Sequence, residues 1–268
     1  MLKQKFLIAG ICFFTGVLLV EVISLRALDL TKTTVTQQTI TSSQTIETSK
    51  EQELKPSTTT TNTETKAQKT IALSFDDGPN GTTTPKLLKI LKDQQMHGTF
   101  FALGQNIQLY PEVVKQAVMD GNEVGNHSYD HQYLTRLSLE SVESELKKTD
   151  EEIKKVTGKT VAFVRPPYGS TSNRVAQLIK RPIILWSVDS EDWKTRNSEM
   201  IVQRVQNTVH NGAILLFHDI YSETINAMPQ IIEYLKGQGY QFKTVGELLG
   251  YPTAVECYYG KDDHRKVP

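Results

Sequence analysis

TIALSFDDGP, residues 70–79, is the stretch of sequence that decides the fold. The mostly apolar run from Ile71 to Phe75 is typical of a buried strand, and the Asp-Asp-Gly-Pro that follows is typical of a turn. Ordered structure is therefore expected to begin at about Thr70. The first strand should carry two adjacent carboxylates, Asp76 and Asp77, at its carboxyl end.

Beyond this strand, apolar runs alternate with segments of helical periodicity six or seven times. Such alternation predicts a mainly parallel sheet with helices outside it, either an open α/β sheet or a barrel. In both architectures ligands bind at the carboxyl ends of the strands. The expected strands are 71–75, 99–103, 123–126, 161–164, 183–188, 213–217 and 241–244, and the expected helices are 85–95, 110–119, 138–156, 172–179, 200–209 and 227–235.

Composition narrows the class of protein. The chain has 268 residues, of which 38% are hydrophobic, so a substantial core can form. Its 30 Lys and Arg balance 30 Asp and Glu, and this gives no support for a nucleic-acid partner, which would normally show a basic excess. The two cysteines, Cys12 and Cys257, provide neither a disulfide framework nor a cysteine zinc site.

The N-terminal residues resemble a targeting segment. Lys3 and Lys5 precede an unbroken apolar run over 6–20, as in a signal peptide or a signal anchor. An uncleaved anchor is favoured over a cleaved signal peptide because no small-residue cleavage site follows. The third alternative is that this segment is a buried N-terminal helix of the domain. Lysines before the span place the rest of the chain outside the membrane.

Four regions follow from these patterns. Residues 1–30 form the anchor or signal segment. Residues 31–69 are rich in Thr and Ser and nearly devoid of aromatics, which predicts a disordered linker. Residues 70–250 are expected to form a single domain, which holds the candidate catalytic residues. Residues 251–268 form a C-terminal tail to which we assign no element, with His264 expected to be solvated.

Polar, titratable residues follow nearly every expected strand. Because parallel strand ends meet at one edge of a sheet, this convergence predicts an active site there. The residues, in chain order, are Asp76 and Asp77, then His127 and His131, then Arg165 to Tyr168, then Asp189, Asp192 and Trp193, and finally His218 and Asp219.

A metal site is the first expectation. His127 and His131 are four residues apart, and their rings would point the same way in one helical turn. Two imidazoles and one carboxylate suit Zn²⁺, although other divalent metals accept the same ligands. The alternative is two surface histidines near a turn. It is disfavoured because Asp76, Asp77 and His218 also follow the ends of expected strands.

Acid–base chemistry is the second expectation. Adjacent side chains diverge, so one of Asp76 and Asp77 can bind metal while the other takes a proton from water; a plain turn is the alternative. His218 is either structural or a proton donor, and Asp192 is the candidate partner that would raise its pKa. From the sequence pattern alone, Trp193 and Leu216 fit the wall of a pocket and packing in the core equally well.

Five segments together resemble the ordered motifs of the polysaccharide deacetylases, the NodB-type proteins of carbohydrate esterase family 4. The resemblance covers roughly residues 70–249 and is strongest to the bacterial peptidoglycan N-acetylglucosamine deacetylases. Ser74, where Thr is commoner, is the single departure. The segments are Ser74-Phe-Asp-Asp-Gly-Pro79, His127-Ser-Tyr-Asp-His131, Arg165-Pro-Pro-Tyr168, Asp189-Ser-Glu-Asp-Trp193 and Leu216-Phe-His218.

The resemblance implies a distorted (β/α) barrel of about seven strands and a role for each motif residue. Asp77, His127 and His131 would bind one divalent metal ion, usually zinc, with cobalt or manganese as alternatives. Asp76 would be the base and Arg165 would hold it. The remaining roles are an oxyanion donor, the backbone N–H of Tyr168; a general acid, His218, supported by Asp192; and a pocket for the acetyl methyl shaped by Trp193, Leu216 and Pro167.

The implied reaction is hydrolysis of the N-acetyl group of N-acetylglucosamine in a cell-wall glycan, with release of acetate, by a monomer on the outer face of the membrane. The anchor and linker favour peptidoglycan over chitin oligomers, poly-N-acetylglucosamine or acetylxylan. A non-catalytic glycan-binding module is a rival, but no motif residue is missing. A membrane-anchored structural protein is a further rival that leaves the strand-end cluster unexplained.

Overall fold

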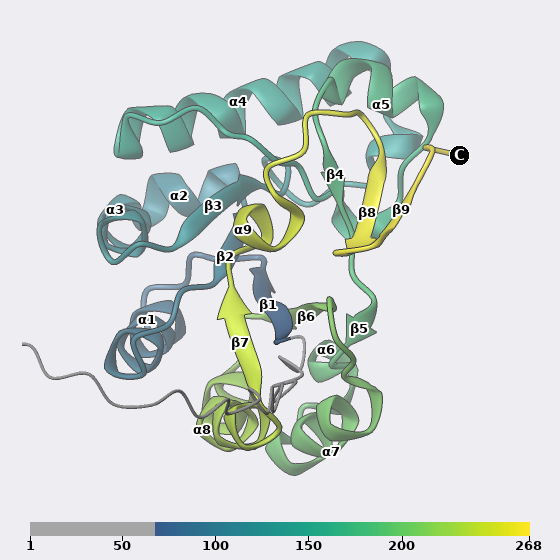
Figure 1. The fold of residues 1–268 in the computed structure, drawn as a ribbon. Coiled ribbons are helices and arrows are strands. Elements are labelled where there is room, and N and C mark those ends of the chain that lie inside the picture. The colour runs from purple at the N-terminus through teal and green to yellow at the C-terminus, as the bar shows by residue number, and fades with distance from the viewer. Residues whose placement is uncertain (1–67) are drawn as a thin grey trace, which may run out of the picture. The chain divides into compact units, whose positions relative to one another are not determined.

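The computed structural model describes residues 68–268 (Figure 1). The anchor or signal segment expected at 1–30 and nearly all of the expected linker therefore lie outside the described residues. In the part of the chain that is described, no helix is long and apolar enough to cross a membrane.

A mainly parallel sheet lies at the centre of the domain. Its strands follow the order β3-β2-β1-β6-β5, and β7 pairs with the first half of β1. Every pair in this sheet is parallel, as the alternation of strands and helices predicted. The strands are β1 (Lys69–Asp76), β2 (Thr99–Ala102), β3 (Glu123–Asn126), β5 (Val188–Asp189), β6 (Ile214–His218) and β7 (Tyr240–Lys243).

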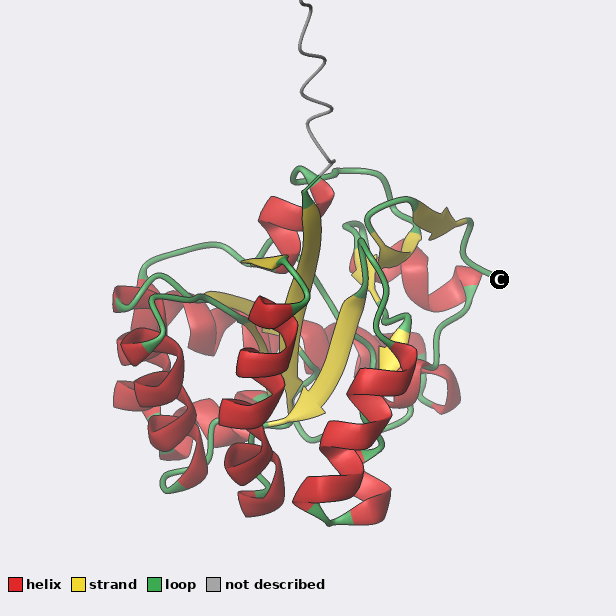
Figure 2. Ribbon diagram, turned by 60° about the horizontal axis from the view of Figure 1, so that its bottom comes forward, coloured by secondary structure: helices red, strands yellow, loops and turns green. Residues whose placement is uncertain are grey.

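Helices surround the strands, as Figure 2 shows. The long amphipathic helix α4 begins after Ser138, whose side chain accepts a hydrogen bond from the Ser141 N–H, so the expected cap is present. The helices are α1 (Thr83–Asp93), α2 (Gly104–Leu109), α3 (Pro111–Met119), α4 (Leu139–Thr157), α5 (Asn173–Ile179), α6 (Asp192–Thr195), α7 (Ser198–Thr208), α8 (Ser222–Gly237) and α9 (Val245–Leu249).

The alternation of side chains along β1 sets the position of the site. Ile71, Leu73 and Phe75 are fully buried in the core beneath the outer helices. Ala72 points to the other face, where it packs with Phe101, Phe163 and Ile214. Because successive residues of a strand face opposite sides, Asp76 belongs with Ala72 on the inner face.

The sheet continues towards a barrel but does not close. Isolated bridges at Val164 extend it from β3 to β4 (Ile183–Ile184), so the strand expected at 161–164 is reduced to one paired residue. The strand expected at 183–188 is two short strands, β4 and β5. Among the described residues no pairing joins β4 to β5. The α/β class is confirmed, with an open ring of strands.

The C-terminal residues contribute two strands for which the sequence suggested no element. β8 (Cys257–Gly260) pairs in parallel with β4, and β9 (Asp263–Arg265) pairs antiparallel with β8. These strands cover the free edge of β4. His264 is exposed on β9, and its Nδ1 lies 2.6 Å from a carboxylate oxygen of Glu256.

Candidate active site

A cavity of about 360 Å³ lies at the carboxyl ends of the central strands. The structure brings most of the predicted residues together there, although they come from distant parts of the sequence. The lining residues are Asp76, Asp77, His127, His131, Tyr168, Trp186, Asp189, Trp193, Leu216, His218 and Tyr221.

Asp77, His127 and His131 form a cluster that fits a divalent metal ion. Their ligand atoms all lie within 4.8 Å of one another. Oδ1 of Asp77 lies 3.4 Å from Nε2 of His127 and 3.2 Å from Nε2 of His131, yet this buried oxygen accepts no hydrogen bond from the described residues. A buried oxygen without a donor is rare and calls for a partner, and a cation held by one carboxylate and two imidazoles supplies one.

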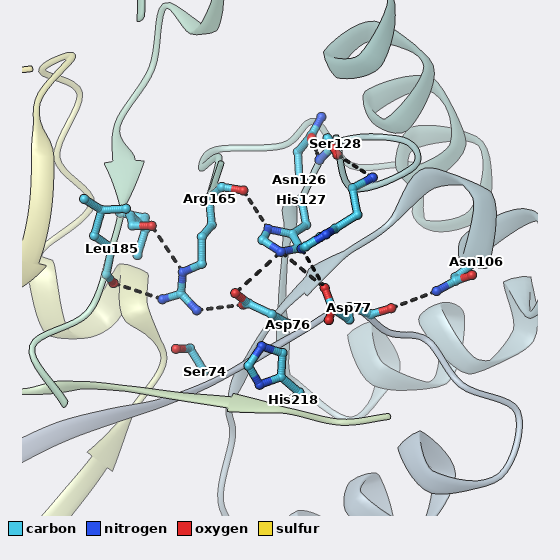
Figure 3. Close-up of polar contacts among 12 residues, drawn as sticks. Ser74, Asp76, Asp77, Asn106, Asn126, His127, Ser128, Arg165, Leu185 and His218 are labelled. Carbon is cyan, nitrogen blue, oxygen red and sulfur yellow. Dashed lines mark hydrogen bonds and ion pairs between the residues drawn. The ribbon is translucent and has the colours of Figure 1, made fainter. Parts of the chain in front are cut away.

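The charge state of Asp77 also suits a ligand. Burial by itself raises the pKa of this carboxyl, but the nearby imidazole of His127, together with those of His131 and His218, outweighs burial and lowers the pKa to about 2. Asp77 is therefore ionised at neutral pH. Its backbone has a φ of 73°, and its carbonyl accepts a hydrogen bond of 2.8 Å from the side-chain amide of Asn106 on α2 (Figure 3).

His127 is oriented by the backbone of the neighbouring strand end. Its Nδ1 lies 2.7 Å from the carbonyl oxygen of Arg165, which can only accept, so Nδ1 carries the proton (Figure 3). Nε2 then keeps its lone pair and faces Asp77. A metal-ligating histidine is commonly fixed in this way through its other ring nitrogen.

The segment from His127 to His131 is a strained loop and not the helical turn that would have aligned the two rings. Ser128 and His131 adopt φ values of 70° and 68°, in the left-handed region. Asn126 holds the first bend, because its Oδ1 accepts a hydrogen bond of 2.8 Å from the Ser128 N–H. Oγ of Ser128 in turn accepts one of 3.1 Å from the His131 N–H, and the two rings end 5.1 Å apart.

Glu145 supports the same loop and escaped the sequence analysis. It lies on α4, is 7% exposed, and its Oε2 accepts hydrogen bonds from the N–H groups of Tyr129 (2.9 Å) and Asp130 (3.1 Å). The signal was present in the sequence, because position 145 falls on the buried stripe of the helix with Val142 and Thr149. A carboxylate on that stripe requires donors inside the protein.

Asp76 is held by a fully buried arginine. Nη1 of Arg165 lies 2.7 Å from Oδ1 of Asp76, and the other guanidinium nitrogens donate to the carbonyl oxygens of Ile184 and Leu185 (Figure 3). Oδ2 of Asp76 lies 3.6 Å from Nε2 of His127. The ion pair therefore fixes one carboxylate oxygen and directs the other towards the candidate metal site formed by Asp77, His127 and His131.

His218 and Asp192 form the second acid–base pair. Nδ1 of His218 donates to Oδ1 of Asp192 over 2.7 Å, and the fully buried carboxylate also accepts from the His218 N–H, the Thr224 hydroxyl and the Trp193 N–H. Burial lowers the pKa of His218, but the hydrogen bond and charge of Asp192, with Asp76 and Asp77, raise it to about 9. His218 is therefore protonated at neutral pH.

The other predicted residues divide between the cavity wall and its surroundings. Tyr168 has a φ of 59°, lines the cavity, and its N–H donates to no group in residues 68–268. Trp193 is half exposed and Leu216 is buried; both contribute to the wall. Pro167 is buried and does not line the cavity.

Two further wall residues, Trp186 and Tyr221, were missed. Trp186 falls within an expected strand, where an apolar residue reads as core. Tyr221 follows His218 by three residues and contacts it, with ring centroids 5.6 Å apart. Its place just beyond a strand end was the available signal.

Comparisons with known proteins point in one direction. A family model described as polysaccharide deacetylase matches residues 63–182. The chain is 46% identical over 181 residues to the peptidoglycan-N-acetylmuramic acid deacetylase PdaC of Bacillus subtilis, covering 68% of this chain and 39% of that protein. It is 41% identical over 203 residues to the peptidoglycan-N-acetylglucosamine deacetylase PgdA of Listeria monocytogenes, covering 75% of this chain and 44% of that protein.

Comparison with solved structures points to the same family as the sequence comparisons. The solved structure of peptidoglycan deacetylase PdaC from Bacillus subtilis superposes with a TM-score of 0.67 at 45% identity, covering 69% of this chain and 92% of that one. The chain spans only 39% and 44% of the length of the two curated relatives, so the similarity concerns one part of each of those longer proteins.

Proposed function

Because the chain belongs to the polysaccharide deacetylase family, we propose that it hydrolyses the N-acetyl groups of amino sugars in a cell-wall glycan and releases acetate. The proposed substrate is N-acetylglucosamine in peptidoglycan, supported by the names of the relatives, which refer to peptidoglycan. The observation that carries the proposal is a single cavity lined by the metal-binding cluster, by Asp76 and by His218.

The metal ion is proposed to be zinc, because one carboxylate and two imidazoles match the ligand preference of Zn²⁺. When bound, the ion would supply a Lewis acid that polarises the acetamide carbonyl and makes water more acidic. Asp77, His127 and His131 would hold it. Sites of this composition also accept other divalent ions, so the metal must be established by measurement.

Asp76 is the proposed general base. Its Oδ1 is held by Arg165, and Oδ2 faces the metal-binding cluster, where it can take the proton of the water that attacks the acetamide carbon. The Tyr168 N–H, which has no acceptor among residues 68–268, can donate to the carbonyl oxygen as negative charge develops there. A donor of this kind contributes roughly 3–4 kcal/mol in comparable sites.

His218 is the proposed general acid. It is protonated at neutral pH, and because Nδ1 is committed to Asp192, its Nε2–H is the proton available to the departing nitrogen. Proton transfer to this nitrogen lets the C–N bond break, leaving a free amine on the sugar and releasing acetate. Trp193 and Leu216 form the apolar part of the wall and are proposed to contact the acetyl methyl group.

We further propose that residues 1–30 anchor the protein in the membrane and that the domain acts on the outer side. The support is the order of Lys3, Lys5 and the apolar run. Accessibility of the domain to protease added to intact cells tests this placement, and protection of the domain until the cells are lysed would contradict it.

Acetate release tests the proposed activity. The protein would be incubated with purified peptidoglycan, chitin oligomers and acetylated xylan, with and without a chelator. We expect release from peptidoglycan that the chelator abolishes and that added zinc restores. Release from xylan alone would make the protein an esterase, and absence of metal-dependent release from all three substrates would refute the proposed function.

A further inference from the structure

A stack of side chains leads from the metal-binding cluster to the arginine Arg136. The ring of Tyr168 meets His131 edge-on with centroids 4.6 Å apart. The ring of Tyr133 stacks on Tyr168 at 3.8 Å, with the planes only 10° apart. The guanidinium carbon of Arg136 lies 4.1 Å from the centroid of the Tyr133 ring. Three consecutive contacts therefore connect this exposed cation to a proposed metal ligand.

The backbone around Arg136 is anchored on both sides. Nη2 of Arg174 donates to the carbonyl oxygens of Thr135 and Leu137, each over 3.0 Å, and these residues flank Arg136. The hydroxyl of Thr135 also lies 2.9 Å from that of Ser170, just beyond Tyr168. Tyr133 and Arg174 thus fix the arginine before any ligand arrives, which lowers the entropic cost of binding one.

The charge of Arg136 is unmatched within the described part of the chain. No carboxylate of residues 68–268 forms an ion pair with it, and its guanidinium donates no hydrogen bond there. Arg196 offers a close comparison, because it also lies on a tyrosine, 3.8 Å from the centroid of the Tyr221 ring. Arg196, however, is paired with Glu223 over 3.0 Å.

We propose that Arg136 binds a carboxylate carried by the glycan next to the acetamide that is hydrolysed. The ligand class is an amino-sugar polymer bearing carboxylates, either the lactyl carboxylate of muramic acid or a carboxylate of the peptide attached to it. A guanidinium presents paired donors that match the two oxygens of a carboxylate. This inference rests on the proposed function and adds a preference for anionic over neutral glycans.

Three substrates test the inference and separate the two sources of carboxylate. They are a neutral chitin tetramer, a peptidoglycan glycan freed of peptide, and peptide-bearing fragments of the same glycan. kcat and KM for acetate release would be measured for the wild type and for the variants R136Q, R136K and R196Q. R196Q is the matched control, because it removes an arginine from a tyrosine near the cavity but one that already has a carboxylate partner.

For R136Q we expect the preference in kcat/KM for carboxylate-bearing over neutral substrate to fall about tenfold, mainly through KM, as loss of a hydrogen bond to a charged group predicts. R136K should retain part of this preference, because lysine keeps the positive charge. A loss on the peptide-free glycan assigns the lactyl carboxylate, and a loss confined to peptide-bearing fragments assigns the peptide. If R136Q leaves the preference unchanged, or shifts it no more than R196Q, the inference fails although the activity stands. Absence of acetate release by the wild type from every glycan refutes the proposed function itself.

Discussion

Asp76 and His218 occupy paired positions on the neighbouring parallel strands β1 and β6. Two positions upstream, Ser74 pairs with Leu216 in the same register. Residues paired in this way project from the same face of a sheet, so the proposed base and the proposed acid leave adjacent strand ends side by side. The register of one strand pair thus sets the spacing of the two groups.

Replacing Asp76 by Asn should remove the base and leave the metal ligands in place. The amide oxygen can still accept the hydrogen bond of Arg165, so the variant is expected to fold with reduced stability. Acetate release should fall by about 10²-fold or more, the usual contribution of a general base. Kinetics would be measured beside metal content and circular dichroism, with the exposed Asp93→Asn as control. Near-wild-type turnover in a metal-loaded variant would rule Asp76 out as the base.

Replacing Asp192 by Asn should change the pH dependence of the reaction. Asp192, with smaller contributions from Asp76 and Asp77, raises the pKa of His218 to about 9 against the effect of burial, so His218 keeps its proton up to about that pH. Without the negative charge the pKa of His218 falls, and the proton donor is lost at lower pH. The alkaline limb of the kcat/KM profile should therefore move to lower pH, with activity at pH 8 reduced more than at pH 6.

Thr224→Val is the matched control for this experiment. It removes one hydrogen bond to the Asp192 carboxylate but keeps the charge, so the alkaline limb should stay near its wild-type position. An Asp192→Asn profile that is lowered equally at all pH values would show that Asp192 only supports the fold.

The sequence predicted those parts of the fold that depend on local pattern. The apolar run over 71–75 identified β1, and the polar residues after nearly every strand identified the candidate site because parallel strands end at a common edge. β8 and β9 were not predicted, because the partner of β8 is β4, far away in the chain. Such pairing depends on long-range contacts that no local periodicity records.

Loop geometry was the other limit of prediction. The spacing of His127 and His131 suggested a helical turn, whereas two left-handed residues and the side chains of Asn126 and Glu145 create the same proximity. The cost of such conformations is met by surrounding hydrogen bonds, which only the folded structure shows. The three residues of the candidate metal site were thus predictable from the sequence, while the groups that position them were not.

Replacing Glu145 by Gln should weaken metal binding. The neutral amide is a poorer acceptor for the Tyr129 and Asp130 N–H groups, so the loop that presents His131 becomes less fixed. Outer groups of this kind influence metal affinity by about 10- to 100-fold, and we expect the lower end. The dissociation constant for zinc would be measured by chelator competition, with Glu151→Gln on the exposed side of α4 as control. An unchanged dissociation constant would limit Glu145 to supporting the fold.

Replacing Asp219 by Asn should stabilise the protein at alkaline pH. Asp219 is buried beside the site, its Oδ2 accepts the hydroxyl hydrogen bond of Thr84 over 2.5 Å, and its Oδ1 has no donor among the described residues. Burial raises the pKa of this carboxyl from 3.8 to about 7. As pH rises between these values the unfolded chain loses the proton first, so the free energy of unfolding falls, by up to about 4 kcal/mol above pH 7.

Asn cannot ionise, so the variant should escape this loss. The Asn side chain is still a polar group in a buried site. The variant should therefore gain less stability than the wild type loses through ionisation of Asp219, about 1–3 kcal/mol at pH 8. The gain should shrink at pH 5, where the folded protein still holds the proton. Urea unfolding of the metal-loaded wild type, Asp219→Asn and the exposed Asp93→Asn at both pH values measures this difference. A variant that is less stable than the wild type by the same amount at pH 5 and pH 8 would show that the Asp219 carboxylate stays ionised in the folded protein.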